Sequence, residues 1–258
     1  MGTSSNDFKA WRAGSLADMT RLPSEPALAK VTAGGPHMNA MKILQSVEEL
    51  LYEVMSWLLF YPRTLAMTLR HPLRTMHYSD AEQRDKPEKQ YLETLSPPLF
   101  LVLSILLAHG LELLFGVPVT DEPNPVSRFI TASEQNLLAF RALMFSLHPL
   151  VFAWAFLKLS KHKVDRDSLR TPFFAQCYLA GATSILVSVG SLGVNDPLIW
   201  TTLTGMAIVV AITVWYIAIQ RLWLMAIPGM VQWKAWAWAF GLYLMTTSLV
   251  VAANALIE

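Results

Sequence analysis

Residues 97–117 read PPLFLVLSILLAHGLELLFGV, an apolar run in which only His109 and Glu112 carry titratable side chains. A helix needs about 20 mainly apolar residues to cross the hydrocarbon core of a bilayer. Four further runs of this kind follow, at about 138–159, 173–194, 198–220 and 235–257. None alternates polar and apolar residues as the strands of a membrane barrel do. The predicted fold is therefore all-α, a polytopic membrane protein with a bundle of five transmembrane helices.

Composition and charge support this class and exclude several others. Hydrophobic residues make up 53% of the 258 residues and charged residues 15%, whereas soluble domains carry roughly 25% charged residues. The net charge of +1 leaves no basic surplus for binding nucleic acid. Cys177 is the single cysteine, so the chain can form no internal disulfide and no cysteine-based zinc site. No cofactor and no metal site is predicted.

The charged residues divide the chain into three parts. Residues 1–96 hold 22 of the 39 charges, 11 basic and 11 acidic. We predict a flexible segment at 1–37, cytoplasmic amphipathic or interfacial helices with a charged linker at 38–96, and the transmembrane domain at 97–258. Basic residues are retained on the cytoplasmic side of a membrane, and 18 of the 20 precede the first span or lie in alternate connections. The N-terminus is therefore predicted to be cytoplasmic and the C-terminus to lie on the opposite side.

Two patterned segments precede the first span. From 40 to 60 apolar residues recur at helical spacing, which predicts an amphipathic helix. The stretch 61–74 is basic, and three of its side chains are candidates for contact with anionic lipid headgroups: Arg63, Arg70 and Arg74. Both segments can instead pack against the ends of the spans or against a neighbouring subunit. The mixed-charge run 80–93 is predicted to be a solvated linker or a short helix.

Ionisable side chains inside a span cost several kcal/mol unless they are paired or hydrated. Four of them fall in the first two spans: His109, Glu112, Arg141 and His148. At about 1.5 Å per residue, Glu112 and Arg141 lie at a similar depth, roughly 5 to 8 Å from the same membrane face. The two histidines lie deeper, and offsets of three and seven residues return to nearly the same side of a helix. The four side chains are therefore predicted to form a polar seam between these spans.

Two interpretations of this seam remain open. In the first, the histidines relay protons or hold a cation or a lipid headgroup. In the second, Glu112 and Arg141 form a structural ion pair and the histidines are neutral and hydrogen-bonded. The small and hydroxyl residues of the third and fourth spans also have two interpretations. They either allow the helices to pack closely or line a hydrated path. Gln176 and Gln220 lie near span ends, where water can solvate them.

The sequence contains no recognisable catalytic constellation. An intramembrane protease would need paired aspartates or a nucleophile with its base, and Asp196, in a loop, is the only aspartate near a span. No Gly-x-Ser-x-Gly turn is present. His162 lies close in sequence to Asp165 and Asp167, a group that reads as a solvated charge cluster. We predict that the chain is not an enzyme.

Three short segments resemble a known family: Phe60-Tyr61-Pro62-Arg63-Thr64, His71-Pro72 and Ser96-Pro97-Pro98-Leu99-Phe100. Together with five spans and an outside C-terminus they resemble the bacterial Yip-type (Ypt-interacting-protein) membrane family, whose members are often labelled permeases. The resemblance covers residue 41 to the C-terminus. It implies a five-helix bundle in a bacterial-type inner membrane, with a role in membrane organisation, lipid handling or solute passage.

The seam and the resemblance together predict an inner-membrane permease or channel-like protein that moves an ion, a small solute or a lipid. Five spans are few for a monomeric transporter, so we expect a homo-oligomer surrounded by membrane lipids. The alternative is a scaffold without transport activity. Its amphipathic cytoplasmic helices would recruit a protein partner or organise lipid.

Overall fold

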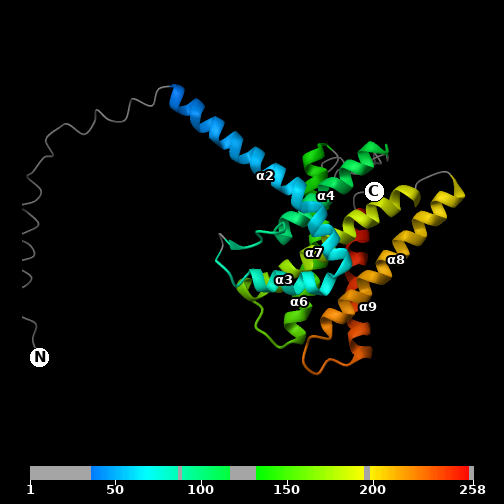
Figure 1. Cartoon of the computed structure of the whole chain (residues 1–258). Coiled ribbons are helices and arrows are strands. Elements are labelled where there is room, and N and C mark those ends of the chain that lie inside the picture. Colours follow the sequence, from blue (N-terminus) through cyan, green and yellow to red (C-terminus); the bar gives the residue numbers. More distant parts are fainter. Residues whose placement is uncertain (1–35, 87–88, 117–131, 195–197, 256–258) are drawn as a thin grey trace, which may run out of the picture. The chain divides into compact units, whose positions relative to one another are not determined.

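The computed structural model describes residues 36–86, 89–116, 132–194 and 198–255, which form helices and their connections without any strand. The helices are α2 (Pro36–Arg70), α3 (Pro72–Glu82), α4 (Pro97–Leu114), α6 (Glu134–Leu159), α7 (Arg166–Val194), α8 (Ile199–Leu224) and α9 (Gln232–Ala255) (Figure 1). Within these residues, α4, α6, α7, α8 and α9 are long and apolar enough to cross a membrane. The predicted all-α fold with five transmembrane helices is confirmed. Of the predicted flexible segment 1–37, residues 1–35 lie outside the described residues.

The chain divides into two compact units, Met1–Val54 and Met55–Glu258. All five membrane helices, and the functional site below, belong to the second unit. Residues 55–96 also belong to it, although the sequence suggested a boundary at the start of the first span. The reason is that side chains from the end of α2 and from α3 contribute to the same buried clusters as the spans.

Helix α2 continues through Pro62, where the sequence suggested that one helix ends and a separate basic stretch begins. Proline has no N–H group, so the carbonyl of Leu58 loses its usual helical donor. Both Pro62 and Leu58 are exposed, which leaves this carbonyl open to hydration. Two residues further on, the Thr64 hydroxyl donates to the Phe60 carbonyl at 2.8 Å. The proline therefore removes one hydrogen bond without ending the helix.

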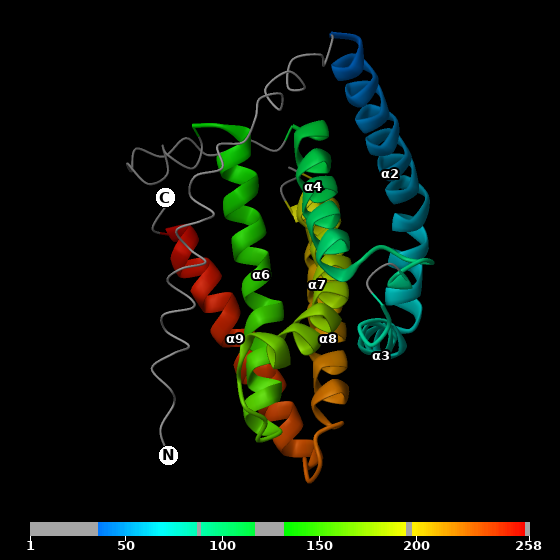
Figure 2. The ribbon, with the colours of Figure 1, turned by 90° about the vertical axis from the view of Figure 1, so that its left-hand side faces the viewer.

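Helix α7 is the central helix of the bundle. It packs against α3, α4, α6 and α8, and Figure 2 shows α4 and α6 running alongside it. It begins at Arg166, earlier than the predicted 173. Asp165 and Ser168 account for this start, because the Ser168 N–H donates to the Asp165 carboxylate at 2.9 Å and the Asp165 N–H donates to the Ser168 hydroxyl at 3.0 Å. Such a reciprocal pair satisfies N–H groups that an open helix end leaves unpaired.

Glycine residues bring α7 and α8 into backbone contact. A methyl group placed on Gly205 of α8 would lie 2.6 Å from the carbonyl oxygen of Gly190 and 2.6 Å from the backbone nitrogen of Val194. A methyl group on Gly193 would lie 3.1 Å from the Cα of Gly205. Small residues allow such close approach between membrane helices. At this level the small residues serve close packing, which was one of the two interpretations of the sequence.

Two buried amides join α7 and α8 at a second place. Gln176 lies nearer the start of α7, and Gln220 lies nearer the end of α8. The Gln176 amide donates to the Gln220 oxygen at 2.9 Å, and the Gln220 amide donates back at 2.6 Å. Both side chains are fully buried, so the expectation that water solvates them is wrong. Each amide satisfies the other, which removes the main cost of burying a polar group.

The connection before α4 is packed rather than solvated. Thr94 and Leu95 are buried. The Leu95 carbonyl accepts a hydrogen bond from the Tyr178 hydroxyl at 2.6 Å, and the Leu95 N–H donates to the Thr64 hydroxyl at 3.2 Å. The predicted linker 80–93 is therefore followed by a segment, Thr94 and Leu95, that is held between α2 and α7. A pattern of charges does not reveal such backbone bonds, because their partners are distant in sequence.

Asp80 on α3 makes the stability of the protein depend on pH. Its Oδ1 atom is buried and accepts no hydrogen bond from the described residues. Burial raises the pKa of this carboxyl from 3.8 to about 6, although the charges of His77 and Arg84 oppose the rise. The folded protein therefore binds this proton more tightly than the unfolded chain, and the stability contributed by this group falls as the pH rises from about 4 to about 6.

We expect Asp80→Asn to raise the thermal unfolding midpoint at pH 7, because asparagine never has to carry the buried charge. The gain should shrink towards pH 4, where the carboxyl is protonated in the folded protein. Thermal unfolding in detergent, followed by tryptophan fluorescence at both pH values, measures this difference. Asp85→Asn, at an exposed position, is the matched control. An equal effect of Asp80→Asn at the two pH values would contradict the prediction.

Candidate functional site

Three of the four predicted seam residues meet between α4 and α6. Arg141 of α6 donates to the Glu112 carboxylate of α4 and lies 2.9 Å from Nδ1 of His109. His109 is buried, whereas the Glu112 and Arg141 side chains are 24% and 26% exposed. Glu112 stands two residues before the end of α4, so the cluster lies near that end of the bundle. The structure thus brings together the two residues that the sequence placed at equal depth.

The geometry also fixes the hydrogen-bonding role of His109. A guanidinium group can only donate, so Nδ1 of His109 accepts the bond from Arg141. The Glu112 carboxylate is 4.0 Å from the same nitrogen. Arg141 therefore bridges the Glu112 carboxylate and the His109 ring.

A cavity of about 150 Å³ adjoins this ion pair. It is lined by residues of α4, α6 and α7: Ile105, Ala108, Glu112, Arg141, Phe145, Ser184, Val187, Ser188 and Ser191. The three serines recur at intervals of four and three, which places them on one side of α7. The Ser188 hydroxyl donates to the carbonyl of Ala108 at 3.2 Å and so links α7 to α4. This cavity is called the outer cavity below.

The fourth seam residue, His148, lies in a different place. Its ring is 6.3 Å from that of Tyr216 on α8 and 6.0 Å from that of Tyr243 on α9, measured between centroids. It stands two turns beyond Arg141, about 10 Å further along α6. At this level α6 meets aromatic rings of α8 and α9, whereas Arg141 meets α4. The expectation that all four residues form a single seam between α4 and α6 therefore needs correction at His148.

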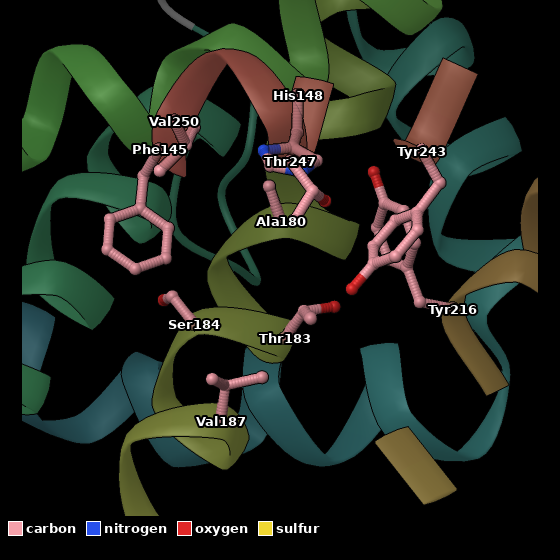
Figure 3. A pocket seen from close by; sticks show the side chains of 10 residues that line it. All are labelled: Phe145, His148, Ala180, Thr183, Ser184, Val187, Tyr216, Tyr243, Thr247 and Val250. Atoms are coloured by element: carbon pink, nitrogen blue, oxygen red, sulfur yellow. The ribbon is translucent and has the colours of Figure 1, made fainter. Parts of the chain in front are cut away.

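His148 faces a second cavity, of about 170 Å³, which Figure 3 shows. The residues that line it come from α6, α7, α8 and α9: Phe145, His148, Ala180, Thr183, Ser184, Val187, Tyr216, Tyr243, Thr247 and Val250. This cavity is called the inner cavity below. It shares Phe145, Ser184 and Val187 with the outer cavity. The two cavities are therefore neighbours separated by these three side chains.

Sequence reasoning missed Tyr216 and Tyr243, because it considered only ionisable and small residues within the spans. The Tyr216 hydroxyl is buried and forms no hydrogen bond of standard geometry with the described residues, although the Gln220 side chain interacts with it. The Tyr243 hydroxyl, in contrast, lies 3.3 Å from the Thr213 hydroxyl. A tyrosine in the middle of an apolar span was itself a signal, because its hydroxyl needs a partner when it is buried.

The three candidate lipid contacts lie at the surface. Arg63, Arg70 and Arg74 are exposed. Arg63 also forms a salt bridge of 2.7 Å with Glu93, so a headgroup would compete with that carboxylate. Contact with lipid stays a prediction for all three. Among the described residues, no group of three or more His, Cys, Asp or Glu side chains could hold a metal ion.

Comparison with family models, with curated proteins and with solved structures found no match to this chain. The resemblance to Yip-type proteins stays a prediction. What the chain shows of itself is the architecture of a multi-pass membrane protein, with a charged cluster and two neighbouring cavities inside its helix bundle.

Proposed function

We propose that this chain is a permease that carries a small uncharged solute through its helix bundle by way of the two cavities. The observation that carries the proposal is their common wall of Phe145, Ser184 and Val187. The outer cavity adjoins the ion pair near the end of α4, and the inner cavity reaches His148 in the middle of α6. Together they form a route with polar groups at both levels.

The charges along this route favour an uncharged solute. Glu112 and Arg141 are the charged residues among the side chains that line the cavities, and they pair with each other. An ion that entered would lose its hydration without meeting an uncompensated opposite charge, at a cost of several kcal/mol. An uncharged solute loses much less hydration energy in the same place.

The serine side chains on α7 supply acceptors for such a solute. The Ser184 hydroxyl donates to the Gly181 carbonyl at 2.8 Å, and the Ser188 hydroxyl donates to the Ala108 carbonyl at 3.2 Å. Each hydroxyl oxygen retains lone pairs after its proton is used. A solute with N–H or O–H groups can therefore move from one serine oxygen to the next along one side of the helix.

Phe145 is the residue through which the route can be tested. Its side chain lines both cavities, so the larger ring of Phe145→Trp should narrow the passage between them. Phe240→Trp is the matched control, because Phe240 lies on α9 and is 52% exposed. The assay measures efflux of radiolabelled nicotinamide, a small uncharged probe, from vesicles that contain the protein. Efflux of radiolabelled rubidium is measured in parallel as the cation probe.

We expect nicotinamide to leave faster than from protein-free vesicles, and rubidium to leave at the protein-free rate. Phe145→Trp should slow nicotinamide efflux roughly fivefold or more, since pore diameter governs permeation. Phe240→Trp should leave it unchanged. Equal efflux through the wild type and Phe145→Trp would refute this route. If neither probe left faster than from protein-free vesicles, the permease proposal would fail and the scaffold alternative would replace it.

A further inference from the structure

We propose that the inner cavity binds the ring of an uncharged aromatic molecule that carries one hydrogen-bonding substituent, such as a primary amide. The inference rests on the proposed function and names the class of solute. Figure 3 shows the lining side chains around an open centre, with Phe145 on one side, the two tyrosines opposite, His148 above and Thr183 below. Three properties of the inner cavity lead to this class of ligand: its volume, the aromatic side chains in its walls, and the polar groups that it presents.

The volume suits one ring with a small substituent. The inner cavity measures about 170 Å³, and an apolar protein cavity of about 150 Å³ is large enough to bind benzene. A second ring or an extended chain would not fit inside. The cavity is thus too small for a large substrate, and it is larger than a single water molecule requires.

The walls offer aromatic rings on two sides. His148, Tyr216 and Tyr243 form a cluster in which every pair of ring centroids is separated by 5.9 to 6.3 Å. Phe145 lines the opposite side. Aromatic rings attract one another at centroid distances of about 4.5 to 7 Å. A ring placed in the centre therefore finds aromatic partners on both sides.

Two polar side chains at this cavity can bind a substituent, Tyr216 and His148. The Tyr216 hydroxyl is buried, with 2% of the residue exposed, and forms no hydrogen bond of standard geometry with the described residues; the Gln220 side chain interacts with it, but the Gln220 amide is already paired with Gln176. The ring of His148 lines the same cavity and lies 6.3 Å from the ring of Tyr216 and 6.0 Å from that of Tyr243, measured between centroids. An unsatisfied buried polar group costs about 1–3 kcal/mol, so the Tyr216 hydroxyl indicates a bound water or ligand.

A primary amide complements these two groups. Its carbonyl oxygen can accept from the Tyr216 hydroxyl, and its N–H can donate to the unprotonated nitrogen of His148. A carboxylate on the same ring would bring an uncompensated negative charge into the middle of the bundle. A ring without a substituent would leave the Tyr216 hydroxyl without a good hydrogen bond. The amide is therefore preferred over both alternatives.

The test compares three probes that share a fluorinated ring. These are 4-fluorobenzamide, fluorobenzene and 4-fluorobenzoate, added to the full chain in lipid nanodiscs and followed by fluorine NMR, with empty nanodiscs as the blank. We expect saturable binding of 4-fluorobenzamide, at least about tenfold tighter than that of either other probe. This comparison uses the wild-type protein and does not depend on the folding of any variant.

Variants then locate the binding site. Tyr216→Phe removes the unpaired hydroxyl and should weaken 4-fluorobenzamide binding roughly five- to tenfold, the value of one hydrogen bond. Tyr243→Phe is the matched control, because that hydroxyl already pairs with Thr213 and its loss should have a smaller effect. Thr183→Leu fills the centre of the cavity and should abolish saturable binding. The melting temperature of each variant checks its folding.

The outcomes separate this inference from the proposed function. The inference is overturned by any of three results: no saturable binding of 4-fluorobenzamide, equal affinity for the three probes, or unchanged binding in folded Tyr216→Phe or Thr183→Leu protein. Binding with the expected preferences, but without nicotinamide efflux from vesicles, would support the site and refute the permease. Efflux that Phe145→Trp slows, without binding of 4-fluorobenzamide, would support the permease and refute the site.

Discussion

Replacing Gly205 with alanine is expected to destabilise the helix bundle by about 3 kcal/mol, the largest effect we predict for the addition of a single methyl group. That methyl group would lie 2.6 Å from the Gly190 carbonyl oxygen and 2.8 Å from the Gly193 carbonyl carbon. Both are backbone atoms of α7, so no side chain can rotate away. The two helices would have to separate, and the contacts that their close approach allows would weaken.

Gly241→Ala is the matched control for this prediction. Gly241 lies within α9, and a methyl group there would meet no atom within 4 Å. Alanine favours a helix over glycine by roughly 0.8–1 kcal/mol, so this variant should be neutral or slightly more stable. Unfolding in detergent, followed by circular dichroism, measures both variants. If Gly205→Ala were as stable as Gly241→Ala, α7 and α8 could not be in backbone contact.

Removing one partner of the Glu112–Arg141 pair is expected to lower the free energy of unfolding by about 3 kcal/mol. This loss is more than half of the loss expected when both partners are removed. Arg141→Met would leave the Glu112 carboxylate three-quarters buried without a cation. Glu112→Gln would leave the guanidinium with an uncharged amide. In the double variant no uncompensated charge remains, so its loss of stability should be smaller than the sum of the single losses by about 2 kcal/mol or more.

The Arg63–Glu93 pair provides the comparison. Its N–O distance is 2.7 Å, but the two side chains are 57% and 72% exposed. Exposed pairs contribute about 0–1 kcal/mol because water screens both charges. Unfolding free energies of the two single variants, the double variant and the wild type give the coupling energy at each site. Equal coupling at the two sites would mean that the Glu112–Arg141 pair is as well hydrated as the surface pair.

The sequence alone was sufficient for the fold class and for the charged cluster. A bilayer accepts only structures that satisfy their own backbone hydrogen bonds, so five long apolar runs predict five helices. Along a helix, a residue number converts into depth. Glu112 and Arg141 could therefore be placed at the same level, and they pair in the structure. His109, one turn away from Glu112, joined them for the same reason.

The packing of helices around one another depends on tertiary structure. His148 has the periodicity of Arg141 but meets Tyr216 and Tyr243 instead of α4. Gln176 and Gln220 are 44 residues apart, and only the approach of α7 to α8 pairs their amides. A helical pattern gives the direction and depth of a side chain, and it does not identify the helix opposite. The charged cluster therefore followed from the sequence, whereas the inner cavity and its unpaired Tyr216 hydroxyl required the packed bundle, because four helices contribute to its walls.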